Sequence, residues 1–171
     1  MLRRITAGFV VVVLMASSRG FSLELGQLAP SFSLAPLQAE SPAQLDSRAY
    51  RGQVIYVDFW ASWCGPCRLS LPQLNTLYRD FSEKGFAVIA VNVDAHRSEA
   101  LKFLQRRPVD YPVVYDAKRE LPALFGVKGM PTAFLLDRQG RVQHIHEGFR
   151  PGDAEQLRAM ITQLLAQEGA I

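Results

Sequence analysis

The stretch from position 54 to position 68 reads VIYVDFWASWCGPCR. It begins as a run of β-branched and aromatic residues, which predicts a buried strand. It ends in Cys64-Gly65-Pro66-Cys67, and Pro66 suits the first turn of a helix, where its missing N–H would have no partner. Apolar residues then return at helical spacing, at Leu69, Leu71, Leu74, Leu77, Tyr78 and Phe81. The stretch therefore predicts a strand, a short turn and a helix that opens on a thiol.

The chemistry of this stretch lies in its two cysteines. At the predicted helix N-terminus, free backbone N–H groups and the positive end of the helix dipole face the sulfur of Cys64. Such an environment favours the thiolate and can lower a cysteine pKa from ~8.5 to between ~3.5 and ~7.5. Thiol–disulfide exchange needs an attacking thiolate and a second thiol that resolves the mixed disulfide. We therefore predict that Cys64 attacks and that Cys67 resolves.

Two other interpretations of the cysteine pair are weaker. The pair could be half of a zinc site, but the sequence has no further cysteine, and His96, His144 and His146 fall in separate predicted elements. A static structural disulfide occurs in many exported proteins, but a bridge across so short a loop stabilises little. We therefore expect no metal site and no cofactor beyond the dithiol itself.

The first twenty residues have the order basic, apolar, small, which is typical of a secretory signal peptide. Arg3 and Arg4 precede the apolar run from Ile5 to Ala16, which is shorter than the ~20 residues that span a bilayer. We expect residues 1–20 to be a signal peptide and residues 21–171 to be the exported domain. An uncleaved anchor in the inner membrane is the alternative.

The composition of the 171 residues, with 49% hydrophobic and 20% charged, is typical of a folded globular domain. The formal net charge of +3 is matched by three arginines in the predicted leader, Arg3, Arg4 and Arg19. Without them the domain is formally neutral, so the basic balance does not indicate a nucleic-acid partner.

Strand and helix patterns alternate along the rest of the chain. Asp137 to Gly140 separates two strand patterns and predicts a hairpin with glycine in its turn. Such strand–helix units, followed by a hairpin and a helix, predict an α/β domain with a mixed sheet. The expected strands are 32–34, 54–60, 86–93, 113–115, 132–136 and 142–146. The expected helices are a short turn at 45–50, then 65–84 with a bend or restart at Pro72, one from Ser98 to Arg107, 120–125, and one from Asp153 onward.

Two motifs in the sequence resemble those of a known superfamily. Trp63-Cys64-Gly65-Pro66-Cys67, with Asp58 to Ala61 before it, is similar to the active-site motif of thioredoxins. Gly129-Met130-Pro131-Thr132 resembles the cis-proline loop of that superfamily. The leader, residues 26–34 and the long segment before Met130 resemble the exported TlpA/ResA branch. The resemblance covers roughly residues 26–165 and implies a thioredoxin fold, with a mixed central sheet flanked by helices and an N-terminal extension.

The resemblance also implies roles for particular residues. Asp58 would lie beneath the second cysteine as its proton acceptor. Pro131 would be cis, which leaves the backbone N–H and C=O of Met130 free to pair with an extended substrate. Trp63, Gly65 and Pro66 would form the contact surface beside the sulfurs, whereas Trp60 belongs to the core.

Three positions depart from related proteins. Many TlpA/ResA-like proteins have asparagine where this chain has Asp58. Ala90 stands where thioredoxins have a lysine partner for that aspartate, and Ala95 stands where ResA-like proteins have a glutamate. The resolving thiol is therefore expected to lose its proton to Asp58 or to water alone. His144 and His146 alternate on one strand, and we expect them to be solvated surface.

The sequence thus predicts a periplasmic, monomeric thiol-disulfide oxidoreductase that reduces disulfides of exported proteins and draws electrons from a membrane protein. Cytochrome c biogenesis is one substrate pathway that the family suggests. Three alternatives stay open. A disulfide-forming oxidant would usually have a more polar pair than Gly65-Pro66, and a peroxidase would have threonine in place of Ala61. A non-enzymatic peptide-binding module would not need both cysteines.

Overall fold

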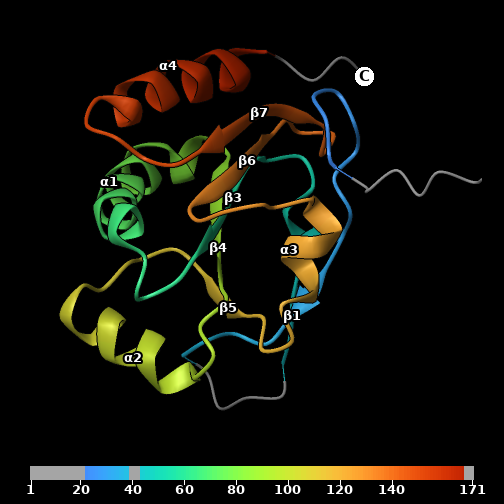
Figure 1. Cartoon of the computed structure of the whole chain (residues 1–171). Coiled ribbons are helices and arrows are strands. Elements are labelled where there is room, and N and C mark those ends of the chain that lie inside the picture. Colours follow the sequence, from blue (N-terminus) through green and yellow to red (C-terminus); the bar gives the residue numbers. More distant parts are fainter. Residues whose placement is uncertain (1–21, 39–42, 168–171) are drawn as a thin grey trace, which may run out of the picture.

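The computed structural model describes residues 22–38 and 43–167 (Figure 1). The predicted leader, residues 1–20, lies outside this range. Within the described residues, no helix combines the length and the apolar character that a membrane crossing needs.

A mixed sheet of five strands forms the centre of the domain, in the order β5-β4-β3-β6-β7. The strand β3 lies in the middle of this order and is buried along its whole length, which agrees with its mostly apolar sequence. It pairs in parallel with β4 and antiparallel with β6, while β5 and β7 form the two edges. The strands are β3 (Val54–Trp60), β4 (Phe86–Asn92), β5 (Val113–Tyr115), β6 (Thr132–Leu136) and β7 (Val142–Glu147).

Helices cover both faces of this sheet (Figure 1). The helices α1, α2 and α4 pack their apolar side chains into one core cluster with Tyr56 and Trp60 of β3. The short helix α3 packs into a second cluster with Val57 and Phe59, which point to the opposite face. The helices are α1 (Gly65–Phe81), α2 (Arg97–Arg106), α3 (Glu120–Phe125) and α4 (Asp153–Ala166). The expected α/β thioredoxin-type architecture is confirmed.

The N-terminal extension crosses the α3 face and reaches both edges of the sheet. At one edge Gly26 and Gln27 exchange backbone hydrogen bonds with Val142 of β7. At the other edge the Leu37 N–H donates to the Val113 carbonyl and the Tyr115 N–H donates to the Ala35 carbonyl. The extension therefore satisfies backbone groups that would otherwise be left open for pairing with another chain.

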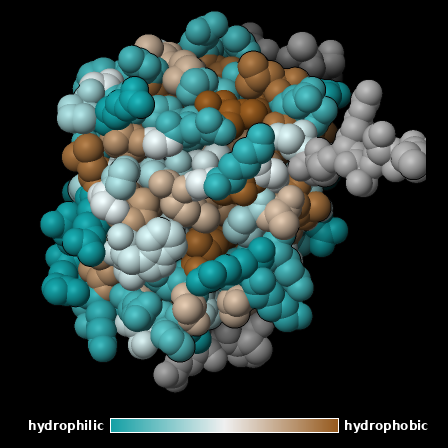
Figure 2. Space-filling model, in the orientation of Figure 1, coloured by the Kyte–Doolittle hydropathy of each residue, from teal (hydrophilic) through white to brown (hydrophobic). Residues whose placement is uncertain are grey.

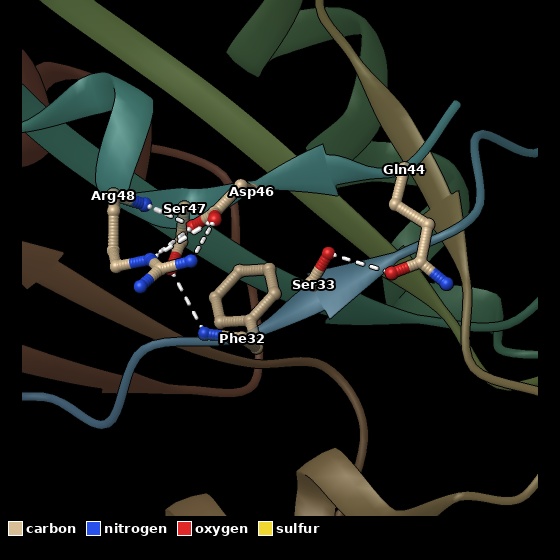
Figure 3. Close-up of polar contacts among 6 residues, drawn as sticks. All are labelled: Phe32, Ser33, Gln44, Asp46, Ser47 and Arg48. Atoms are coloured by element: carbon tan, nitrogen blue, oxygen red, sulfur yellow. Dashed lines mark hydrogen bonds and ion pairs between the residues drawn. The ribbon is translucent and has the colours of Figure 1, made fainter.

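A small separate sheet holds this extension in place and differs from the prediction. The strand β1 (Ser33–Leu34) pairs with β2 (Leu45–Asp46) and not with the central sheet. Only Ser47–Tyr50 of the expected helical turn is helical, as a 3₁₀ turn, η1. Figure 3 shows the reason, since Asp46 accepts from Arg48 and caps the turn, while the Ser47 hydroxyl accepts the Phe32 N–H.

Two helix boundaries also differ from the prediction. The helix α1 continues through Pro72 as one element, and a 3₁₀ turn, η2 (Ser82–Lys84), follows it. The helix α2 starts at Arg97 with His96 as its N-cap residue, so Ser98 does not cap it. The Arg97 guanidinium donates to the Leu37 carbonyl at 2.8 Å. This contact with the N-terminal extension fixes the first turn, and no local sequence pattern records it.

Candidate active site

The two cysteines lie at the start of α1, just after the end of β3. Cys64 is the N-cap residue of α1, and its sulfur accepts a hydrogen bond from the backbone N–H of Cys67 at 3.2 Å. Pro66 lies in the first helical turn, and a disulfide joins Cys64 to Cys67. The predicted arrangement of strand, turn and helix around the motif is confirmed.

The residues in and around the cysteine motif differ widely in their exposure to solvent. Trp63 is open to solvent, with 61% of its surface exposed, whereas Trp60 is fully buried in the core. Cys67 is fully buried, and Cys64 is only 4% exposed. Cys64 is thus nearly as buried as Cys67 in the disulfide form, because its sulfur is bonded to Cys67 and accepts the Cys67 N–H in the first turn of α1.

Asp58 is the one charged residue within β3, and it is 1% exposed. Side chains alternate along a strand, so Asp58 points to the same face as Tyr56 and Trp60. That face is covered by α1, and the core cluster on it contains both cysteines. The Asp58 side chain therefore does not reach solvent at the end of the strand.

The neighbours of Asp58 in the sheet are both alanines. Ala90 of β4 and Ala133 of β6 are its partners in register, and neither can pair with a carboxylate. Its Oδ2 has no hydrogen-bond partner among the described residues. Burial raises the pKa of the Asp58 carboxyl from 3.8 to about 8, because a buried and unpaired carboxylate is costly. A carboxyl that titrates so close to neutral pH is suited to exchange a proton with a buried thiol.

The loop before β6 lies at the same end of the sheet as the cysteines, because Thr132 pairs with Phe59 near the end of β3. The Met130–Pro131 peptide bond is cis, as expected. Neither the N–H nor the C=O of Met130 forms a hydrogen bond with another described residue, whereas the Pro131 carbonyl accepts the Gly148 N–H. An open groove of about 320 Å³ follows this loop from Lys128 to Thr132.

A buried network anchors the turn that carries the cysteines, and it is absent from the predictions made from the sequence. Asp94 is fully buried and accepts from the Ser62 N–H and hydroxyl, each at 3.1 Å, and from the Asn92 side chain at 2.9 Å. The Asp94 N–H donates in turn to the Asn92 side-chain oxygen. The signal available in the sequence was Asn92-Val93-Asp94, two polar residues at the end of an otherwise apolar strand.

The two histidines of β7 are not the solvated surface that we expected. A ring nitrogen of His144 lies 3.4 Å from one of His146, whose other ring nitrogen lies 3.1 Å from an Asp153 carboxylate oxygen. Only 12% of the His146 side chain is exposed. The start of α4 brings Asp153 against His146, and both histidines are half-buried. Among the described residues, no group of three or more His, Cys, Asp or Glu side chains is arranged to hold a metal ion.

Comparison with known proteins agrees with this geometry. The family model described as Redoxin matches residues 24–161. The chain belongs to this family. Within it, the chain is a TlpA/ResA-like member of the thioredoxin superfamily and a thiol-disulfide oxidoreductase, as the following relatives show.

Two bacterial proteins and one solved structure illustrate the likeness. The chain is 29% identical over 157 residues to thiol-disulfide oxidoreductase ResA of Geobacillus thermodenitrificans (strain NG80-2), covering 85% of this chain and 88% of that protein. It is 32% identical over 161 residues to thioredoxin-like protein YneN of Bacillus subtilis (strain 168), covering 86% and 92%. A Chlorobium tepidum structure assigned as thiol:disulfide interchange protein DsbE has a TM-score of 0.79 and 46% identity, covering 84% and 99%.

Replacement of Asp94 tests the anchoring network. Asp94→Ala leaves the Ser62 and Asn92 donors without their acceptor, so we expect a loss of about 2–4 kcal/mol in the free energy of unfolding. We also expect slower disulfide exchange, because the turn before Cys64 loses its anchor. Denaturant unfolding and insulin reduction measure the two effects.

A second buried aspartate provides the matched control. Asp116 is 3% exposed and accepts from the N–H groups of Glu120 and Leu121 at the start of α3, on the other face of the sheet. Asp116→Ala should lose stability without a comparable loss of exchange rate. Equal rates in Asp94→Ala and Asp116→Ala would show that Asp94 does not position the active-site turn.

Proposed function

We propose that this oxidoreductase works as a reductant of disulfides in exported proteins, in the periplasm. The observation that carries the proposal is a redox-active pair at the start of α1, with one buried carboxyl group on the same face of the sheet. The predicted leader supports export, and Gly65-Pro66 between the cysteines supports the reducing direction. The dithiol is the whole redox group, and no further cofactor takes part.

The first step of the proposed reaction uses Cys64. In the reduced enzyme its thiolate attacks one sulfur of a substrate disulfide, which forms a mixed disulfide and releases the other substrate sulfur as a thiolate. The backbone N–H of Cys67 that reaches the Cys64 sulfur, together with the helix N-terminus, stabilises the negative charge before attack.

The second step uses Cys67 and Asp58. Burial favours the neutral thiol at Cys67, which therefore needs a base. Asp58 in its ionised form takes the thiol proton, and the resulting thiolate attacks Cys64. The second substrate sulfur leaves as a thiolate and takes up a proton, and the enzyme ends with the disulfide seen in the structure.

Substrate would lie across the exposed end of the site. Trp63, Gly65 and Pro66 supply the contact surface, and the free backbone groups of Met130, before cis-Pro131, supply hydrogen bonds to an extended segment. The partners implied are exported proteins with disulfides, of which cytochrome c precursors are one class, and a membrane protein that reduces the enzyme again. We propose that the enzyme acts as a monomer.

A trapping experiment tests this function. Cys67→Ser removes the resolving thiol, so the mixed disulfide on Cys64 should accumulate in cells. We expect covalent adducts with exported proteins in the periplasmic fraction and none with the double variant Cys64→Ser/Cys67→Ser. Adducts found only with cytoplasmic proteins would contradict the location, and reduced enzyme that leaves insulin intact would contradict the reducing role.

Kinetics of Asp58→Asn test the role of the carboxyl. Asparagine cannot accept the proton, so resolution of the mixed disulfide should slow, whereas attack by Cys64 should change little. General-base help is worth ~10²–10⁴-fold, and we expect the low end because no charged neighbour assists Asp58. In the parent, resolution should accelerate from pH 6 to about pH 8 as Asp58 ionises, and the variant should lack that rise.

Stopped-flow tryptophan fluorescence follows both steps, because Trp60 and Trp63 flank the site. Asp116→Asn is the control, since it changes another buried aspartate that lies on the opposite face of the sheet. Resolution at the parent rate and with the parent pH profile in Asp58→Asn would mean that water takes the proton.

A further inference from the structure

A pocket of about 230 Å³ lies where the first turn of α1 meets the end of α2, apart from the cysteines and the Met130 loop. Four residues line it, and three of them are arginines: Arg68, Phe103, Arg106 and Arg107. In Figure 2 hydrophilic side chains cover the lower left of the surface, over α2 and its junction with α1. The pocket thus combines a cationic wall with one aromatic ring.

The pocket is built onto the redox motif itself. Arg68 follows Cys67 directly, and its guanidinium donates to the Ser62 carbonyl, two residues before Cys64, at 3.2 and 3.3 Å. Arg107 donates in turn to the Arg68 carbonyl at 3.2 Å. These hydrogen bonds hold Arg68 and Arg107 close to the two ends of the cysteine motif, at Ser62 and at Arg68 itself.

The aromatic ring of the pocket, Phe103, packs against the hydrophobic core beneath it. The Phe103 ring lies 5.5 Å from the ring of buried Trp60, measured between centroids. The Arg107 guanidinium lies 6.0 Å from the Phe103 ring centroid, within reach of a cation–π contact. The pocket is therefore joined to the end of β3 in two ways: Phe103 packs on Trp60, and Arg68 bonds to the Ser62 backbone carbonyl.

The positive charge of this pocket is not balanced within the described part of the chain. None of its three arginines forms an ion pair with a described carboxylate, and their hydrogen bonds go to backbone carbonyls of Ser62, Arg68 and Lys102. Three other arginines of the domain have carboxylate partners, in the pairs Arg48–Asp46, Arg79–Asp110 and Arg158–Asp80. Arg119, Arg138 and Arg141 donate to backbone carbonyls, as the pocket arginines do, but they do not line one pocket together. A guanidinium has five N–H donors, so several here remain available to a ligand.

We propose that this pocket binds a carboxylate side chain, Asp or Glu, of the disulfide-bearing protein substrate. Guanidinium groups bind carboxylates with two parallel hydrogen bonds, which gives both affinity and orientation. Pockets for whole small-molecule ligands are usually ~300–1,000 Å³, so this smaller volume suits a side chain. The inference rests on the proposed function and adds a charge preference to it.

The topology of the sheet explains how one substrate segment can contact both the Met130–Pro131 groove and the arginine pocket. The groove at Met130 and Pro131 precedes β6, on one side of β3, and the arginine pocket belongs to α2, which follows β4 on the other side. The cysteine turn after β3 lies between them. A segment whose cysteine meets Cys64 therefore has the backbone groove on one flank and the arginines on the other.

Three matched peptides test the charge preference. Each carries one cysteine as a disulfide with a chromogenic thiol, and the residues on both flanks of that cysteine are Glu, Gln or Lys. With reduced enzyme at low salt, the Glu peptide should react about tenfold faster than the Gln peptide, and the Lys peptide should react slowest. The preference should shrink as salt is added, because salt screens exposed charges.

Arg106→Glu is the informative variant, because the Arg106 guanidinium bonds only within its own helix. It should bring the ratio of Glu to Gln rates close to one. Arg51→Glu makes the same charge change before β3, at the end of the strand remote from the cysteines, and should leave both rates unchanged. Inorganic phosphate at constant ionic strength should compete with the Glu peptide only.

The outcomes separate this inference from the proposed function. If the Gln peptide is reduced but the Glu peptide shows no advantage, the carboxylate site is wrong and the reductant stands. The inference also fails if Arg106→Glu keeps the parent ratio, or if phosphate binds the pocket while the peptides react alike. If no peptide is reduced, the proposed function fails and this inference fails with it.

Discussion

The burial of Asp58 in the central strand is the constraint on which the rest of the site depends. A carboxyl group placed there must be either paired or neutral, since an isolated buried carboxylate is costly. Its register neighbours are Ala90 and Ala133, and neither offers a charge or a hydrogen bond. The group is therefore held neutral by its surroundings up to a pH near 8. In the proposed reaction, this same property makes it a base for the buried thiol of Cys67.

Two different parts of the structure tune the two reacting groups, the Cys64 sulfur and the Asp58 carboxyl. The helix N-terminus and the Cys67 N–H stabilise negative charge on the Cys64 sulfur. The sheet buries Asp58 and thereby raises the pKa of its carboxyl. The Asp94 network joins the two, because it ties Ser62 in the cysteine turn to the end of β4. The outer surface then adds recognition, with the backbone groups of Met130 on one side and the arginines of α2 on the other.

Local patterns were sufficient to predict much of the fold. The buried run of β3, the helix after Pro66, the hairpin at Gly140 and the short helix Glu120–Phe125 all carry their own periodicity or glycine signals. The elements that local patterns do not predict depend on partners distant in the sequence. Ser47 is held by Phe32 and Arg97 by Leu37, and no local window contains both members of either pair.

The same distinction applies to the site. The cysteine motif and the proline loop are contiguous in sequence, so resemblance could identify them. The partial burial of His144 and His146 is not predictable from β7 alone, because Asp153, which contacts His146, comes from a different element. Asp94 and the arginine pocket went unnoticed because their roles arise only when β4 and α2 are brought against the cysteine turn.

The central claim, that Asp58 is neutral and unpaired in the folded protein, can be measured through the pH dependence of stability. Below about pH 4 the carboxyl is protonated in both states, so the parent and Asp58→Asn should unfold with similar free energies. Above that pH the unfolded Asp58 carboxyl ionises while the folded one does not, so the parent should lose stability relative to Asp58→Asn as pH rises. The account predicts that the advantage of Asp58→Asn in oxidised protein grows by about 1.4 kcal/mol per pH unit up to about pH 8 and then levels. A difference that stays constant from pH 4 to pH 9 would contradict it.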